Sequence, residues 1–205
     1  MKKICNISFI LSAVMIFQIY PAFGRSEAFK DNIYELGELK PTDSVVKVKI
    51  GEPAPDFTLP SVSGEKVSLS DFKEKKNVVL SFVPAAWTPV CSDQWPGYNL
   101  AKGIFEENEA VLLGITTDNV PTLFAWTNQM GNLWFPVLSD FWRHGATADK
   151  YGVLRSDGMS ERALFAIDKK GIIQYIEVSD INARPKLESL AAALEKMKTP
   201  LTPSK

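Results

Sequence analysis

One cysteine occupies a position in this sequence where a thiol becomes a nucleophile. Cys91 lies in the stretch PAAWTPVCSDQ (residues 84–94), directly after the apolar run NVVLSFV (77–83). We predict a buried strand for the run and a helix after it, so Cys91 falls at the carboxyl end of the strand, in or near the first helical turn. Unpaired backbone N–H groups and the positive end of the helix dipole favour a thiolate there.

Two neighbours of Cys91 suit such a site, and each also has an ordinary structural explanation. Thr88 precedes the cysteine by one helical turn, where its hydroxyl can donate to and accept from groups beside the sulfur. The same threonine is also a good helix cap. Pro84 ends the apolar run, and because it has no N–H it can simply stop the strand ladder. Neither residue alone separates a catalytic role from a structural one.

The first 24 residues have the composition of a secretory signal. Lys2 and Lys3 precede an apolar stretch (4–20), and the A-F-G at 22–24 offers a cleavage site after Gly24. The alternative is an uncleaved membrane anchor, but four polar residues interrupt the stretch, which is shorter than the roughly 20 residues of a spanning helix. We therefore expect an exported protein, periplasmic or extracellular, with no membrane attachment after cleavage.

Cleavage changes both the charge and the cysteine count of the chain. The balance of basic to acidic residues moves from 23 against 24 to 21 against 24, since the signal holds two lysines and no acid. The one basic cluster, KEKK at 73–76, is typical of a solvated loop, so nucleic acid is excluded as a main partner. Cys5 is removed, and Cys91 is then either a buried inert thiol or a reactive one.

The remaining sequence alternates between strand and helix patterns. Strands are predicted at 67–69, 77–83, 110–118 and 135–140, with two more joined by a turn within 163–178, and helices at 91 to about 108, 120–130, 144–152 and 185–197. This alternation predicts an α/β fold with helices on both faces of the sheet and a late antiparallel pair. We expect a signal at 1–24, an N-terminal extension serving as linker or edge element at 25–48, one domain at 49–198 and a flexible tail at 199–205.

The motif W-T-P-V-C resembles the W-C-x-x-C of thiol-disulfide oxidoreductases, with Thr88 in place of the first cysteine. A dithiol enzyme attacks with its first cysteine and needs a second to release the mixed disulfide. Because threonine cannot attack, ordinary dithiol exchange is disfavoured. A thioredoxin-like redox sensor or a thiol-disulfide partner protein stays open as the alternative function.

A second resemblance covers most of the predicted domain, about residues 49–198. Pro84, Thr88 and Cys91 form P-x-x-x-T-x-x-C, preceded by GEPAPDFTLP (51–60) and followed by LFAWTNQ (123–129) and R-x-x-F-x-I-D (162–168). In this order the four motifs resemble the peroxiredoxin family, the alkyl hydroperoxide reductase and thiol-specific antioxidant superfamily. Because no second cysteine remains after cleavage, the chain is similar to the one-cysteine type.

The resemblance implies a thioredoxin-like fold with a central mixed sheet, and a thiol-dependent peroxidase that reduces hydrogen peroxide or organic hydroperoxides. Cys91 corresponds to the peroxidatic nucleophile, which becomes a sulfenic acid. Thr88 would hydrogen-bond the thiolate and the peroxide, Arg162 would stabilise charge on the departing oxygen, and Pro84 would shield the pocket from water. An external thiol, either a thioredoxin-like protein or a small thiol, would recycle Cys91. The family analogy also implies a homodimer.

Several residues leave alternatives open. Arg162 could instead form a surface ion pair with Glu161, and Arg155 would then be the active-site arginine. Gln94 replaces a glutamate frequent in the family, so a neutral hydrogen bond to the arginine is expected in place of a salt bridge. Trp87 packs either beside the pocket or in the core.

Three further residues bear on the site more weakly. Pro96 and Gly97 are expected to interrupt the first turns of the helix after Cys91. His144, followed by glycine, is expected to be structural or on the surface. No cluster of histidines, cysteines and acids suggests a metal, and we expect no cofactor.

Overall fold

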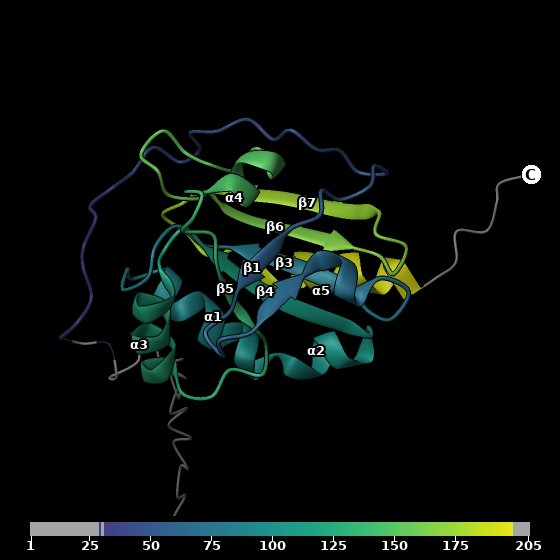
Figure 1. Cartoon of the computed structure of the whole chain (residues 1–205), viewed down its shortest axis with the longest axis horizontal. Coiled ribbons are helices and arrows are strands. Elements are labelled where there is room, and N and C mark those ends of the chain that lie inside the picture. The colour runs from purple at the N-terminus through teal and green to yellow at the C-terminus, as the bar shows by residue number, and fades with distance from the viewer. Residues whose placement is uncertain (1–28, 30, 199–205) are drawn as a thin grey trace, which may run out of the picture.

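A five-stranded mixed sheet organises the part of the chain that the computed structural model describes, residue 29 and residues 31–198 (Figure 1). From one edge to the other the strands are β5 (Val137–Ser139), β4 (Ala110–Thr116), β3 (Asn77–Phe82), β6 (Arg162–Ile167) and β7 (Ile173–Ser179). β3, β4 and β5 run parallel, whereas β6 is antiparallel to both of its neighbours. The predicted α/β class, with a late antiparallel pair, is confirmed.

The central strand, β3, forms because its sequence can be buried on both faces. All six residues of NVVLSF are buried, as expected for a continuous apolar run in the middle of a sheet. Its register against β6 pairs Phe82 with Ala163. The first residue of β6, Arg162, therefore lies beside the carboxyl end of β3, where the loop to Cys91 begins.

Helices cover both faces of the sheet, as predicted. One face carries α1 (Cys91–Leu100), α2 (Lys102–Glu107), α3 (Val120–Met130) and α5 (Leu187–Lys198). The other carries α4 (Ala146–Tyr151), a short 3-10 helix (Leu69–Phe72) and the hairpin of β1 (Thr58–Pro60) with β2 (Lys66–Ser68). Two apolar cores result, one on each side of the sheet.

The core behind α1 is built from large aromatic side chains. Trp95 on α1 and Trp126 on α3 are both wholly buried, with ring centroids 5.0 Å apart. Trp95 lies so close to β4 that a Cβ added to Gly114 would be 2.7 Å from its Cζ2 atom. Trp126 belongs to the motif LFAWTNQ, which lies on α3. These contacts fix the position of α1 and with it the position of Cys91.

Some predicted boundaries differ from the structure. The helix expected from Cys91 to about residue 108 is two helices, because Ala101 leaves the helical conformation (φ −87°, ψ 15°) between α1 and α2. The expected interruption at Pro96 and Gly97 was wrong, since α1 continues through both. Pro96 has no N–H to donate, so the turn after Cys91 lacks one helical hydrogen bond.

The N-terminal extension was predicted to be a linker or edge element, and residues 31–48 contain no strand. They lie against the domain, held by hydrogen bonds to groups far along the chain, such as Leu39 to Asn182. The predicted signal at 1–24 and the predicted tail at 199–205 lie outside the described residues. Across residues 29 and 31–198, no helix combines the length and apolarity that a bilayer crossing requires.

Candidate active site

Cys91 begins α1 and its side chain is wholly buried. β3 ends at Phe82, and the intervening loop leads into a helical turn in which Ser92 N donates to Thr88 O at 3.0 Å. The sulfur therefore lies at the carboxyl end of the central strand and at the amino end of a helix, where the sequence pattern placed it. The positive end of a helix dipole stabilises negative charge at this position.

The guanidinium of Arg162 lies against the sulfur of Cys91. Arg162 is 2% exposed, and its Nη2 is 3.5 Å from Sγ. Its Nε and Nη2 also donate to the carbonyl oxygen of Ile181, at 3.1 and 2.9 Å. Residues 71 positions apart meet because β6 runs antiparallel to β3 and begins where β3 ends. The cation is thus held rigidly beside the sulfur.

The alternative arrangements for the arginines are wrong. Glu161 does not pair with Arg162; it pairs with Arg155, whose Nη1 is 2.8 Å from Glu161 Oε2. Arg155 also binds Asp157 at 3.0 Å. No described carboxylate lies within 4 Å of the Arg162 guanidinium. The charge of Arg162 is therefore available to the sulfur and to what approaches it.

Gln94 binds the guanidinium nitrogen of Arg162 that Ile181 does not bind. Its Oε1 accepts from Arg162 Nη1 at 2.6 Å, the neutral hydrogen bond expected from a glutamine at this position. Its Nε2 donates to Ser81 Oγ and to Tyr98 OH, both at 3.3 Å. Burial raises the pKa of Tyr98 above its usual range, so the phenol stays neutral. Gln94 fixes the guanidinium without neutralising it.

Thr88 and Pro84 are both buried near the cysteine. The Thr88 hydroxyl donates to Ala85 O at 2.9 Å and not to the Cys91 sulfur, so the expected hydrogen bond from Thr88 to the thiolate is not formed in this structure. A hydroxyl has one proton, so the Thr88 oxygen is left as an acceptor. Thr88 does not cap the helix with its side chain, since the N-cap is Val90 and no side-chain cap bond is present.

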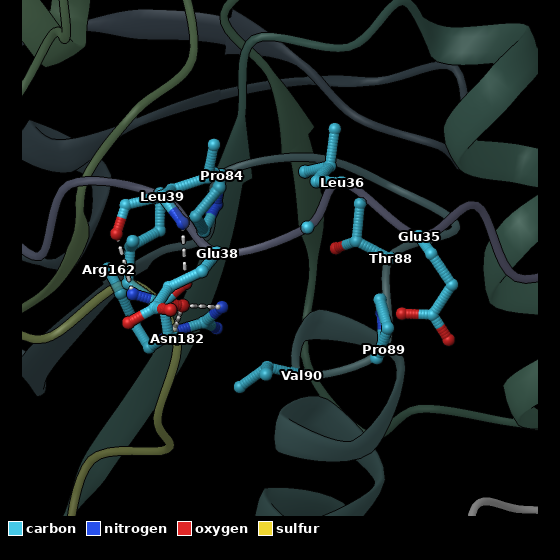
Figure 2. A pocket seen from close by; sticks show the side chains of 12 residues that line it. Glu35, Leu36, Glu38, Leu39, Pro84, Thr88, Pro89, Val90, Arg162 and Asn182 are labelled. Carbon is cyan, nitrogen blue, oxygen red and sulfur yellow. Dashed lines mark hydrogen bonds between the residues drawn. The ribbon is translucent and has the colours of Figure 1, made fainter.

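A pocket of about 330 Å³ opens above this cluster (Figure 2). Figure 2 shows its side chains arranged in a ring, with Arg162 and Asn182 on one side and Thr88 and Pro89 on another. The lining residues come from the N-terminal extension, the cysteine loop and the segment after β7: Glu35, Leu36, Gly37, Glu38, Leu39, Pro84, Thr88, Pro89, Val90, Arg162, Ile181 and Asn182. Cys91 does not line the pocket, but Arg162 both lines it and contacts the sulfur.

Two residues singled out in the sequence lie outside this pocket. Trp87 has a left-handed backbone (φ 62°), and its half-buried ring meets Phe29 edge to face at 6.3 Å between centroids. His144 is exposed, with Nε2 2.7 Å from Gly158 O, as expected for a surface histidine. The described residues hold no group of three or more histidines, cysteines and acids that could bind a metal.

Sequence reasoning missed three parts of the site. The Ile181 carbonyl that fixes Arg162 carries no side-chain signal. A glutamine at position 94 can be expected to donate two hydrogen bonds from its amide, but the sequence does not show that Ser81 and Tyr98 accept them. The residues 35–39 that form one wall of the pocket follow no helical or strand period, so no pattern pointed to them.

A buried cysteine at the amino end of a helix, facing a buried guanidinium in a thioredoxin-like fold, defines a class of thiol enzyme that reacts with small electrophiles. Comparisons with known proteins agree with this class. The model of the AhpC/TSA family matches residues 50–176. Alkyl hydroperoxide reductase E of Mycobacterium tuberculosis (strain ATCC 25618 / H37Rv) is 36% identical over 132 residues, which cover 64% of this chain and 86% of that protein.

Two further relatives support the same assignment. The chloroplastic 2-cysteine peroxiredoxin of Chattonella marina var. antiqua is 34% identical over 146 residues, covering 67% of this chain and 74% of that one. The crystal structure of reduced Plasmodium vivax 2-Cys peroxiredoxin superposes with a TM-score of 0.69 at 28% identity, covering 74% and 82% of the two chains. The chain belongs to the AhpC/TSA family, the peroxiredoxins, and is a thiol-dependent peroxidase.

Proposed function

We propose that Cys91 is the peroxidatic residue of a one-cysteine peroxidase that reduces hydrogen peroxide or small organic hydroperoxides. The observation that carries this proposal is the buried Arg162 guanidinium, 3.5 Å from Sγ and without a neutralising carboxylate among the described residues. A preorganised cation at a developing negative charge lowers the barrier of a displacement at oxygen.

The proposed first step is attack of the Cys91 thiolate on one oxygen of the hydroperoxide. An S–O bond forms, the O–O bond breaks, and the departing oxygen leaves with the electron pair and takes up a proton as water or alcohol. Cys91 becomes a sulfenic acid. Arg162 stabilises the charge on the departing oxygen, while the Thr88 oxygen accepts from the peroxide O–H. Pro84 covers the pocket with a ring that has no N–H to bind water.

The proposed second step uses a thiol from outside the chain. After removal of residues 1–24, Cys91 is the single cysteine of the sequence, so no resolving thiol lies within the chain. An external thiol, from a thioredoxin-like protein or a small molecule, attacks the sulfenic sulfur and releases water. A second thiol then releases Cys91 from the mixed disulfide. Two thiols and one hydroperoxide thus yield a disulfide, water and the alcohol.

We also propose that the protein is exported and forms a homodimer. The composition of residues 1–24 supports export to the periplasm or beyond the cell. Two adjacent exposed aromatics support association, since Phe141 is 47% exposed and Trp142 is 82% exposed. Sedimentation of the mature chain as a monomer at micromolar concentration would argue against the dimer.

Rapid-quench mass spectrometry tests the peroxidase proposal. The reduced mature protein is mixed with hydrogen peroxide, and the fraction of Cys91 oxidised is followed in time without any reductant. Wild type is expected to react orders of magnitude faster than a free thiol, and Cys91→Ser is expected to be inert. A rate of Cys91 oxidation no higher than that of a free thiol would refute the proposal. Turnover with a panel of thiols then identifies the class of reductant.

A further inference from the structure

The N-terminal segment 34–44, called the strap below, is bound to the domain along its length. At one end Tyr34 N donates to Trp87 O at 2.8 Å. In the middle, Leu39 and Asn182 exchange two hydrogen bonds, from Leu39 N at 3.0 Å and to Leu39 O at 2.8 Å. The strap is therefore attached to the cysteine loop on one side of the pocket and to the segment after β7 on the other.

The far end of the strap is held by charged groups. Asp43 N and Ser44 N donate to the buried Glu161 Oε1 at 2.6 and 2.9 Å. The Asp43 carboxylate accepts from Ser156 N at 2.9 Å. Because Ser156 and Lys40 donate hydrogen bonds to it, the pKa of Asp43 lies well below its ordinary value and the group is a carboxylate at neutral pH. None of these anchoring groups at 43, 44, 156 and 161 lines the pocket.

Residues 35–39 of the strap form a wall of the peroxide pocket. Five of the twelve lining residues belong to it, and in Figure 2 Glu38 and Leu39 lie on the side of Arg162 whereas Glu35 lies on the side of Thr88. The match to the family model begins at residue 50, so this wall lies outside the matched domain. The strap thus adds a boundary to the site that the matched domain does not itself supply.

The wall makes the pocket small and places negative charge at its edge. A volume of about 330 Å³ is at the low end for ligand pockets, which favours small molecules. Glu35 and Glu38 both line it. Glu38 forms no ion pair with a described residue, and Figure 2 shows it on the side of Arg162 and Asn182. A substrate bearing a carboxylate must pass this charge before it reaches the guanidinium.

We propose that the strap makes this peroxidase selective for small, uncharged hydroperoxides. In this assignment Glu38 is the residue that disfavours anionic substrates, and the docked strap excludes bulky ones. The inference rests on the proposed peroxidase function of Cys91. It adds the class of substrate and names a segment outside the matched domain as the source of selectivity.

The charge component is tested with two hydroperoxides of nearly equal size, an aliphatic hydroperoxide that carries a carboxylate and its methyl ester. The measured quantity is the ratio of their second-order rate constants for oxidation of Cys91. Removing one charge at the pocket edge with Glu38→Gln is expected to raise the acid-to-ester ratio on the order of threefold at low salt. At 1 M salt, where the Debye length is roughly 3 Å, the ratios of variant and wild type should converge.

The matched control for Glu38→Gln is Glu107→Gln. Glu107 is an exposed carboxylate at the end of α2, which leads into the start of β4 at the opposite end of the sheet from Cys91. The control should leave the acid-to-ester ratio at its wild-type value. A Glu38→Gln ratio equal to that of the control would overturn the charge filter.

The size component is tested with Asp43→Ala, a change outside the pocket that removes an anchor of the strap. The measured quantity is the ratio of the rate constants for the methyl ester of a long-chain fatty-acid hydroperoxide, which is too large for a cavity of about 330 Å³, and hydrogen peroxide. Asp43→Ala is expected to raise it at least fivefold, although Asp43 touches no pocket atom; a purely structural role would slow both peroxides equally. A ratio unchanged from wild type would overturn the proposed exclusion of bulky substrates. Absence of Cys91 oxidation by every hydroperoxide in wild type would instead refute the peroxidase function itself.

Discussion

Replacement of Arg162 by glutamine probes the interaction on which the proposed chemistry depends most. The change removes a buried unit charge whose Nη2 is 3.5 Å from Sγ. At an effective dielectric constant of about 20, a unit charge at this distance contributes roughly 5 kcal/mol to the stabilisation of a unit negative charge. Only part of that charge is new in the transition state, since the thiolate already carries it in the ground state. We therefore expect a loss of about a thousandfold in the rate constant with hydrogen peroxide, close to 4 kcal/mol.

Rapid-quench mass spectrometry of the reduced protein measures this rate constant directly, because single turnover does not depend on the reductant. Alkylation of Cys91 by iodoacetamide is measured in parallel. Alkylation requires the thiolate but breaks no O–O bond, so it should slow much less than peroxide reduction. The difference between the two losses isolates the contribution of Arg162 to the departing oxygen.

Two variants complete the test of Arg162. Lys169→Gln removes an exposed cation that pairs with Glu109 beyond the far end of β6, and should leave both rates unchanged. Arg162→Lys keeps the charge but cannot make the same four contacts to Sγ, Gln94 and Ile181, so an intermediate loss is expected. Circular dichroism and thermal unfolding establish that each variant is folded. A folded Arg162→Gln protein that loses less than tenfold in peroxide rate would refute the reasoning.

Three further predictions follow from contacts in and around the site. Gln94→Ala removes the amide oxygen that now accepts from Arg162 Nη1 at 2.6 Å and so releases one side of the guanidinium, which should lower the peroxide rate constant at least tenfold in a folded protein. Gly114→Ala adds a Cβ 2.7 Å from the buried Trp95 ring, and should destabilise the protein by about 1–3 kcal/mol in urea unfolding. Because the pKa of Asp43 is lower in the folded state, its carboxylate stabilises the strap fully above the unfolded pKa of about 3.9. This stabilisation is lost as the pH falls below that value. Hydrogen-exchange protection of residues 39–44 should therefore decline in acid in wild type, and it should be low at every pH in Asp43→Asn.

The parts of the fold that could be predicted are those in which one element carries its own signal. The buried run at 77–83 and the periodic helix at 120–130, closed by Gly131, both appear in the structure within a residue of their expected ends. The long helix predicted after Cys91 was wrong because the break at Ala101 has neither proline nor glycine to mark it. Local sequence propensity therefore predicts the presence of a helix or strand better than it predicts a break within one.

The active site also has one part that the sequence predicts and another that it does not. Thr88 and Cys91 are three residues apart and are joined by the turn in which Ser92 N donates to Thr88 O, so the sequence spacing was enough to place both at the amino end of the helix. The distance between Cys91 and Arg162 depends instead on the antiparallel register of β6 and on the backbone carbonyl of Ile181. The strand register brings together two residues that are 71 positions apart, which no local pattern reveals. The Ile181 carbonyl is a backbone group that every residue possesses, so no residue type marks it in the sequence.

The sequence by itself determined the alternation of strands and helices, the position of Cys91 after a buried strand and the chemistry available to its thiol. Tertiary structure decided which arginine faces the sulfur, that Gln94 binds it without neutralising it, and that the strap forms a wall of the pocket. The physical reason is that hydrophobic periodicity is a local property of the chain, whereas the strap is held by hydrogen bonds such as that between Leu39 and Asn182, 143 residues apart. Extended segments of this kind have no period, and their position exists only once the rest of the domain has folded.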